Sequence, residues 1–228
     1  MSRFEVTAVD VWSKREQIFL AALDTHETET CENLLGELKS QFPESQRVSR
    51  LEGLLHEVHG DTIKANRVYD KMAETNPSNS LCMKRKICLL KAAGKMSEAT
   101  NQLCEYLSIS PSDVEAWKEL AQIYLEYGNF KQAAFCLEEV LLAHPHSYLS
   151  FLVYAECLYS IGSKSALSTA QKYFSHSLVL KKTSRALWGL ALTSKALKQD
   201  QEISNVCVQT LLADNKGDII VTNAINKI

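Results

Sequence analysis

Apolar residues recur along this chain at the three-to-four-residue spacing of amphipathic helices, and almost no stretch alternates with the two-residue period of a strand. The segment 114–126, for example, places Trp117, Leu120 and Tyr124 at helical spacing. A second helical pattern follows it, with the small residue Ala133 at its centre. The hydrophobic pattern therefore predicts an all-α protein in which helices come in pairs.

The helical pairs repeat with a fixed period, which the prolines mark. The chain has four prolines, and successive ones are 34 residues apart: Pro43, Pro77, Pro111 and Pro145. This is the period of the tetratricopeptide repeat (TPR), a helix–turn–helix unit that stacks into a solenoid. The period predicts an all-α TPR superhelical solenoid of about five to six helical hairpins.

Two further positions of the repeat support this register, in which each proline is position 32. Position 15, between the two helical patterns, holds a residue suited to a turn with positive φ: His26, Gly60, Gly94, Gly128 and Gly162. Position 20 holds a small residue that lets the two helices approach closely: Cys31, Ala65, Ala99 and Ala133. The fifth repeat fits only if three residues near 163–165 are inserted in its turn, which puts Ala170 at position 20 and Phe174 at position 24.

The register divides the chain into an N-terminal segment 1–11, one TPR domain 12–217 and a C-terminal tail 218–228. The expected repeats are 12–45, 46–79, 80–113, 114–147 and 148–184, followed by a degenerate pair at 185–217. No Gly/Ser-rich linker interrupts them, so we expect a single domain. Trp117 and Trp188 are interpreted as core residues at position 4.

The amino-acid composition of the chain argues against several classes of function. The net charge is −2, with 25 basic and 27 acidic residues, which argues against a nucleic-acid binder driven by bulk charge. No stretch approaches the roughly 18 apolar residues of a membrane span, and the N-terminus lacks the apolar region of a signal peptide. The seven cysteines include no C-x-x-C pair, which favours a reducing compartment over a disulfide framework.

No residue pattern predicts catalytic chemistry, a metal site or a cofactor. His56, His59 and Glu52 share one helix face, but a solvated face explains them better than zinc because no further ligand is evident. Most cysteines, including Cys104 and Cys157, are interpreted as small packing residues. The chain is therefore predicted to be a binding protein.

The candidate binding surface is the face of each first helix that lies about 140° from the core positions, which in TPR arrays lines the concave groove. In three successive repeats this face carries basic residues, and apolar residues without an evident core role lie among them. The predicted groove residues are Arg47, Arg50, Leu54, Leu81, Lys84, Lys91, Lys118 and Leu125. The alternative interpretation is that these charged residues only keep this helix face in contact with water and bind no partner.

One alternative function is a TPR co-chaperone adaptor that grips the C-terminal tails of chaperones. That class requires asparagines at positions 9 and 6 of successive repeats. Position 9 here holds Leu20, Leu54, Cys88, Gln122 and Glu156, and position 6 holds Gln17, Leu51, Arg85, Glu119 and Val153. The absence of these asparagines argues against a co-chaperone function for this chain.

Beyond the repeat signature, the sequence resembles the family of subunit 2 of the ER membrane protein complex. The resemblance covers roughly Trp12 to Leu197 and includes segments 115–121 (EAWKELA) and 131–139 (KQAAFCLEE). Residues outside the repeat signature, such as Phe135-Cys136 and the Lys84–Lys86 cluster, carry the identification. Shorter matching segments occur in the same order: QFP (41–43), RVSRL (47–51), KRKI (84–87), HPH (144–146), YAE (154–156), KYF (172–174) and RAL (185–187).

The resemblance implies a non-catalytic scaffold on the cytoplasmic face of the ER membrane, peripheral and without a span of its own. The family's complex inserts transmembrane segments of tail-anchored and multi-spanning proteins without an energy source. Its subunit 2 holds the cytosolic segment of subunit 5, docks subunit 8 or 9 and contacts cytosolic parts of subunits 1 and 3. No nucleic acid is implied as a partner.

Overall fold

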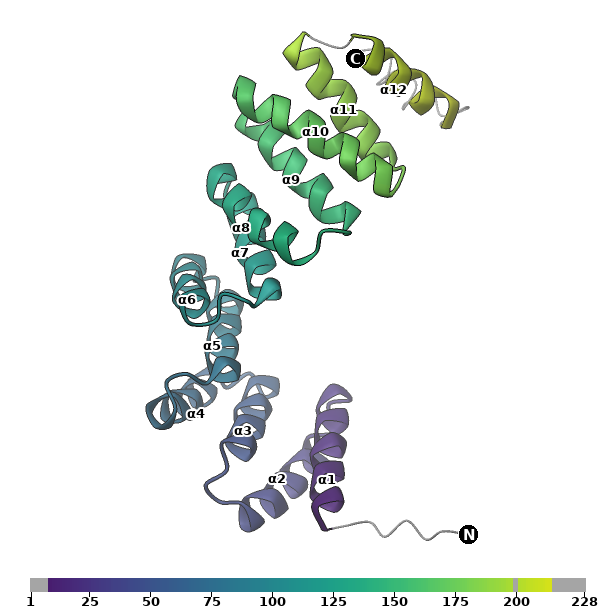
Figure 1. The fold of residues 1–228 in the computed structure, drawn as a ribbon. Coiled ribbons are helices and arrows are strands. Elements are labelled where there is room, and N and C mark those ends of the chain that lie inside the picture. The colour runs from purple at the N-terminus through teal and green to yellow at the C-terminus, as the bar shows by residue number, and fades with distance from the viewer. Residues whose placement is uncertain (1–7, 199–200, 215–228) are drawn as a thin grey trace, which may run out of the picture. The chain divides into compact units, whose positions relative to one another are not determined.

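The computed structural model describes residues 8–198 and 201–214 of the chain, and in these residues it contains twelve α-helices and no strand. The helices follow one another in pairs joined by short turns (Figure 1). The prediction of an all-α TPR fold is therefore confirmed. The chain divides into two compact units, residues 1–109 and 110–228.

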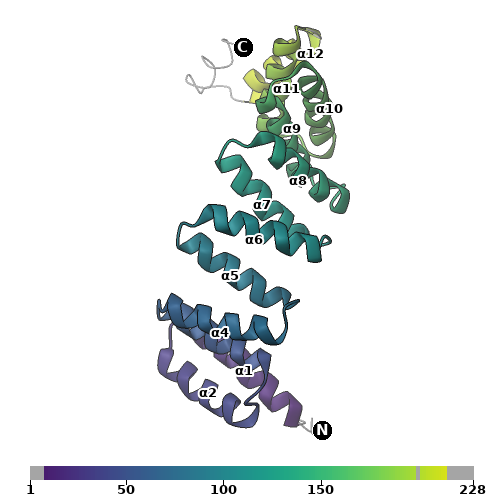
Figure 2. The same cartoon turned by 90° about the vertical axis from the view of Figure 1, so that its left-hand side faces the viewer.

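The first unit contains the hairpins α1–α2, α3–α4 and α5–α6. Their bounds are α1 Ala8–Asp24, α2 Thr28–Gln41, α3 Gln46–Val58, α4 Thr62–Thr75, α5 Ser80–Ala92 and α6 Met96–Ile109. Each hairpin also packs on the next, through α2 against α3 and α4 against α5. Figure 2 shows α5 and α6 side by side, joined at one end by their turn.

The second unit contains the hairpins α7–α8, α9–α10 and α11–α12. Their bounds are α7 Val114–Glu126, α8 Phe130–Ala143, α9 Tyr148–Ile161, α10 Lys164–Leu180, α11 Ser184–Leu197 and α12 Gln201–Asp214. Consecutive helices pack on one another from α7 to α12, and α9 also contacts α11. The predicted tail 218–228 lies outside the described residues.

The turn inside each hairpin has the left-handed conformation that the sequence predicted. Gly60, Gly94, Gly128 and Gly162 have φ between 70° and 74°, and His26 takes the same place in the first hairpin with φ 60°. In the third hairpin, the amide of Lys95 then donates to the carbonyl of Leu90 at 2.9 Å, which satisfies a carbonyl at the end of the helix. Only glycine adopts this conformation without a steric cost, so the periodic glycines follow from the repeated turn.

The starts of three hairpins are fixed by a side-chain cap two residues after the preceding proline, Pro77, Pro111 or Pro145. The side chains of Asn79, Asp113 and Ser147 accept hydrogen bonds from the backbone amides of residues 82, 116 and 150. Such caps satisfy amides that have no partner inside the helix. Proline and cap together end one repeat and begin the next.

Position 20 is buried in the first five hairpins, as predicted. Cys31, Ala65, Ala99, Ala133 and Ala170 are all at most 1% exposed. The prediction of an inserted turn in the fifth repeat was wrong, because α10 begins two residues after Gly162, as α8 does after Gly128. The three additional residues extend α10 to 17 residues, against 14 in α8. Three residues are nearly one helical turn, so Ala170 and Phe174 still face the core.

The prediction that both tryptophans are core residues was wrong. Trp117 and Trp188 are half-buried. The indole nitrogen of Trp117 donates to the carbonyl of Pro111 at 2.8 Å, and its ring meets the exposed ring of Phe135 edge-on. In α11 the buried position is filled by Leu187, one residue before Trp188. Both indoles therefore cover the edge of the core.

Replacing Ala133 with leucine tests the packing at position 20. Ala133 is 0% exposed, so three added carbon atoms would have to displace α7 from α8. We expect the substitution to lower the free energy of unfolding by about 1–3 kcal/mol, measured by urea denaturation followed by circular dichroism. An unchanged denaturation midpoint would contradict the assigned register.

Candidate partner-binding surface

The predicted groove residues Arg47 and Arg50 lie in the first turns of α3 and meet at one carboxylate. Arg47 Nε lies 2.6 Å from Glu16 Oε2, and Arg50 Nη2 lies 3.5 Å from Glu16 Oε1. Glu16, on α1, is only 8% exposed. Two guanidinium groups thus share one carboxylate, which leaves a net charge of +1 (2 − 1) at this point of the surface.

The Glu16 carboxylate does not bind all the N–H donors of either arginine. The side chain of Arg47 is 68% exposed. Arg50 is more enclosed, and its Nε is buried without a hydrogen-bond partner among the described residues. A buried donor without an acceptor is energetically unfavourable, so the site favours an additional anion or polar acceptor.

These arginines line a pocket of about 320 Å³ that crosses from α1 to α5. Its remaining lining residues are Glu16, Gln46, Met72, Asn79 and Leu81. Gln46 Oε1 accepts a hydrogen bond of 2.9 Å from Asn79 Nδ2, which links the starts of α3 and α5. Leu81, a predicted groove residue, is 51% exposed at the side of the pocket.

A second, more apolar pocket of about 380 Å³ adjoins the first and shares Glu16 and Arg47 with it. Trp12 and Phe42 form an aromatic pair in its wall, with ring centroids 5.7 Å apart and an interplanar angle of 85°. The other lining residues are Ser13, Leu38, Ser45, Val48 and Leu51. The sequence reasoning did not include Trp12, Phe42 or Glu16 in the site.

The register contained a signal for Glu16 that the prediction did not use. Position 5 of the first four repeats holds Glu16, Arg50, Lys84 and Lys118. Because first helices of neighbouring repeats lie near one another, the acid at position 5 of the first repeat would have been placed beside Arg50. The aromatic pair is harder to foresee, since Trp12 and Phe42 come from different helices.

The remaining predicted groove residues of the first unit make different kinds of contact. Leu54 was predicted to lack a core role, but it packs against the buried cluster of α1, α2 and α3. Lys84 lies over the ring of Tyr106, with Nζ 5.5 Å from the ring centroid. Lys91 occupies the last turn of α5, where a cation interacts favourably with the helix dipole. Both lysines therefore have structural roles as well as charge.

Two predicted groove residues, Lys118 and Leu125, lie on α7 in the second unit. Lys118 Nζ pairs with Glu115 at 2.7 Å one turn away on the same helix, and Leu125 is half-buried. Alignment of these residues with Arg50 and Lys84 along one stripe stays a prediction.

A polar network that the sequence reasoning missed connects α3, α4 and α5. Arg85 binds both carboxylate oxygens of Glu57, and the hydroxyl of Tyr69 donates to Glu57 Oε1 at 2.6 Å. Burial and the hydrogen bond to Glu57 raise the pKa of Tyr69 above its ordinary value. Burial alone would lower the pKa of Arg85, but the interaction with Glu57 outweighs it and raises that pKa. The network fixes the second repeat against the third.

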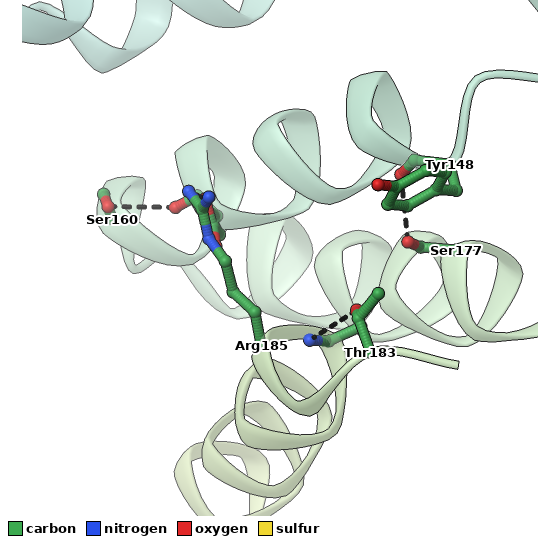
Figure 3. Close-up of polar contacts among 7 residues, drawn as sticks. Tyr148, Ser160, Ser177, Thr183 and Arg185 are labelled. Carbon is green, nitrogen blue, oxygen red and sulfur yellow. Dashed lines mark hydrogen bonds and ion pairs between the residues drawn. The ribbon is translucent and has the colours of Figure 1, made fainter. Parts of the chain in front are cut away.

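An equivalent connection in the second unit joins α9 to α11. The Arg185 guanidinium donates to both carboxylate oxygens of Glu156, at 2.5 and 2.6 Å (Figure 3). At the start of α9, Ser177 Oγ donates to the carbonyl of Tyr148 and ties α10 to α9 within one hairpin. The Thr183 hydroxyl caps α11 by accepting from the amide of Ala186. Of these contacts, the pair of Arg185 and Glu156 connects the fifth repeat to the sixth.

The cysteines fall into two groups. Cys31, Cys82, Cys136, Cys157 and Cys207 are buried, and none of the seven cysteines, all of which lie in the described part of the chain, forms a disulfide bond. Cys104 was predicted to be a packing residue, but it is exposed, as is Cys88. Burial raises the pKa of the Cys157 thiol to about 11. Within the described residues, no group of three His, Cys, Asp or Glu side chains is arranged to hold a metal ion.

This division predicts the reactivity of the thiols. In the folded protein, Cys88 and Cys104 should react rapidly with a maleimide, whereas the five buried cysteines should react only after denaturation. Burial keeps those five thiols away from the reagent. It also raises the thiol pKa of Cys31, Cys82, Cys157 and Cys207, which reduces the amount of thiolate that attacks the reagent. Mass spectrometry of protein labelled with and without urea measures this. Rapid labelling of Cys157 in native buffer would contradict the packing of α9.

Comparisons of the sequence with a family model and with known proteins indicate the same family. Residues 34–180 match the family described as the EMC2 TPR-like repeat domain. The chain is 39% identical over 196 residues to ER membrane protein complex subunit 2-A of Xenopus laevis, covering 86% of this chain and 66% of that protein. It is 35% identical over 166 residues to ER membrane protein complex subunit 2 of Dictyostelium discoideum, covering 72% and 52%.

The fold also resembles solved structures of distant sequence. A tetratricopeptide repeat protein from Parabacteroides merdae superimposes with a TM-score of 0.57 at 13% identity, covering 94% of this chain and 84% of that one. This likeness concerns the fold alone. The chain spans just under two thirds of the length of the Xenopus relative.

Proposed function

Because the chain belongs to the EMC2 TPR-like repeat family, we propose that it is a non-catalytic scaffold subunit of the ER membrane protein complex. The observation that carries the proposal is the family match over residues 34–180, which includes parts of both units. The TPR fold supports it, since stacked hairpins present extended surfaces to other proteins.

The proposed partners are other subunits of that complex. The chain would hold the cytosolic segment of subunit 5, dock subunit 8 or 9 and contact cytosolic parts of subunits 1 and 3. Through these contacts it would support the energy-independent insertion of transmembrane segments by the membrane-embedded subunits. Arg47, Arg50 and Leu81, which line one pocket, are the part of the predicted groove proposed for the segment of subunit 5.

The proposed location is the cytoplasmic face of the ER membrane. None of the helices among residues 8–198 and 201–214 is both long enough and apolar enough to cross a bilayer. Attachment is therefore proposed to depend on the partner subunits.

Affinity purification tests the assignment. The tagged chain would be expressed in cells, and membranes would be solubilised in a mild detergent that preserves complexes. We expect the membrane subunits of the ER membrane protein complex to co-purify in similar amounts, as identified by mass spectrometry. Recovery of chaperones with C-terminal acidic tails in place of these subunits would instead favour the co-chaperone.

Membrane attachment gives an independent prediction. Alkaline carbonate should release the chain from isolated ER membranes into the supernatant, because contacts with other proteins are disrupted at high pH while membrane spans remain embedded. Immunoblotting of the supernatant and pellet measures the result, with an integral membrane subunit as the pellet control. Retention of the chain with that subunit would contradict peripheral attachment.

A further inference from the structure

The two adjoining pockets of the first unit are lined by different side chains. One contains the aromatic pair Trp12 and Phe42, and the other is lined by Arg47, Arg50 and Leu81. Because Glu16 and Arg47 line both, a single extended segment could occupy both pockets at once. Side chains two residues apart lie on the same side of an extended chain, about 7 Å from each other, so alternate side chains of the segment would enter neighbouring pockets.

The positive charge where the two pockets meet, at Glu16 and Arg47, favours a ligand that carries a carboxylate group. The two arginines face a single carboxylate, that of Glu16, which leaves one positive charge uncompensated there. The buried Nε of Arg50 adds a donor without an acceptor. Guanidinium groups bind carboxylates through paired, charge-assisted hydrogen bonds, so an incoming Asp or Glu suits this junction better than a neutral side chain.

Apolar contacts are available on both sides of that junction. Trp12 and Phe42 offer ring faces and edges on one side, and Phe42 is 39% exposed. On the other side Leu81 is 51% exposed at the edge of the arginine pocket. A segment that uses both must continue past the carboxylate in both directions, which points to an acidic side chain within the segment and not to a chain terminus.

We propose that these pockets bind an extended segment of a partner protein with the pattern apolar–x–acidic–x–apolar, where x is any residue, the acidic side chain lies between Arg47 and Arg50, and the apolar side chain two residues before it enters the Trp12–Phe42 pocket. The inference rests on the proposed function in that the partner is a subunit of the same complex. It adds the chemistry by which the segment is recognised.

Peptide binding tests the recognition directly. The probe is a fluorescein-labelled decapeptide with Phe-Ser-Glu-Ser-Leu at its centre and Gly, Ser and Lys elsewhere, blocked at both ends and titrated with the full chain. We expect the Phe-Ser-Gln-Ser-Leu and Ala-Ser-Glu-Ser-Leu versions each to bind about tenfold more weakly, because each loses one of the two contacts. The affinity of the Phe-Ser-Glu-Ser-Leu peptide should fall as salt is raised.

Variants of the chain locate the site. Arg47→Gln should weaken binding of the Phe-Ser-Glu-Ser-Leu peptide about tenfold and leave the affinity for Phe-Ser-Gln-Ser-Leu unchanged, since the lost contact is specific for the carboxylate. Ser13→Trp adds a large side chain to the apolar pocket and should abolish binding without removing an existing contact. The matched control is Arg67→Gln, which makes the same charge change at an exposed residue of α4 that lines neither pocket.

The outcomes separate this inference from the proposed function. Equal binding of all three peptides, or equal weakening by Arg47→Gln and Arg67→Gln, would overturn the inference even if the subunits co-purify. Loss of co-purification with the peptide preferences intact would overturn the proposed function alone. If deletion of residues 1–7 raises the affinity more than about tenfold, the pockets serve the chain's own N-terminus and not a partner.

Discussion

Replacing Phe174 with alanine is expected to lower the free energy of unfolding by about 3–5 kcal/mol, the largest effect of any single substitution we consider. Phe174 is 1% exposed and lies at the centre of α10, which packs on both α9 and α11. Its ring lies against Gly189 so closely that an added methyl group at that glycine would collide with it. Alanine would therefore leave a cavity between three helices that rigid neighbours cannot fill.

The matched control is Phe135→Ala in the same unit. Phe135 is 57% exposed, so its removal changes little buried area and should cost much less than Phe174→Ala. Urea denaturation of both variants, followed by circular dichroism at the helix band, gives the comparison. Similar losses for the two variants would contradict the assigned orientation of α10.

Replacing Gly53 with alanine is expected to destabilise the first unit by about 1–3 kcal/mol, although alanine is the better helix former. A Cβ atom at residue 53 would lie 2.5 Å from the Tyr69 ring, which is too close for either to remain in place. Tyr69 is 0% exposed and its hydroxyl is held by Glu57, which in turn binds Arg85. Displacing the ring would thus disturb the connection between the second and third repeats.

Gly36→Ala provides a control with the opposite sign. Gly36 lies in α2, is exposed, and has open space where its Cβ would be placed. Alanine there should raise the free energy of unfolding by about 0.5–1 kcal/mol through helix propensity alone. Thermal melting of the two variants measures the difference. Stabilisation by Gly53→Ala would mean that α3 and α4 are not packed as closely as described.

The sequence predicted the fold well because the repeat is enforced by local chemistry. Gly60, Gly94 and their equivalents mark turns that need positive φ, and the small residues at position 20 mark the closest helix contacts. The insertion in the fifth repeat was misplaced because a turn and a lengthened helix both shift the register by three residues. Hydrophobic spacing alone does not separate these possibilities when the added residues, such as Ser163 and Ser165, are polar.

The candidate site was less predictable because it depends on pairs of residues from different repeats. Arg47 and Arg50 were identified from their shared helix face, but their common partner Glu16 is more than 30 residues away. Leu54 was misassigned because the core of the first hairpins extends farther around α3 than the idealised face suggests. The pairing of Arg85 with Glu57 was not predicted, because only the packing of α3, α4 and α5 brings the two side chains together.

The most direct test of the scaffold function is restoration of the complex. Cells depleted of subunit 2 of the ER membrane protein complex would be supplied with this chain, and the complex would be examined by native gel electrophoresis and immunoblotting for a membrane subunit. The account predicts that the chain restores the assembled complex and migrates with it. Expression of the folded chain with the membrane subunits still unassembled, and the chain migrating alone, would contradict the scaffold function.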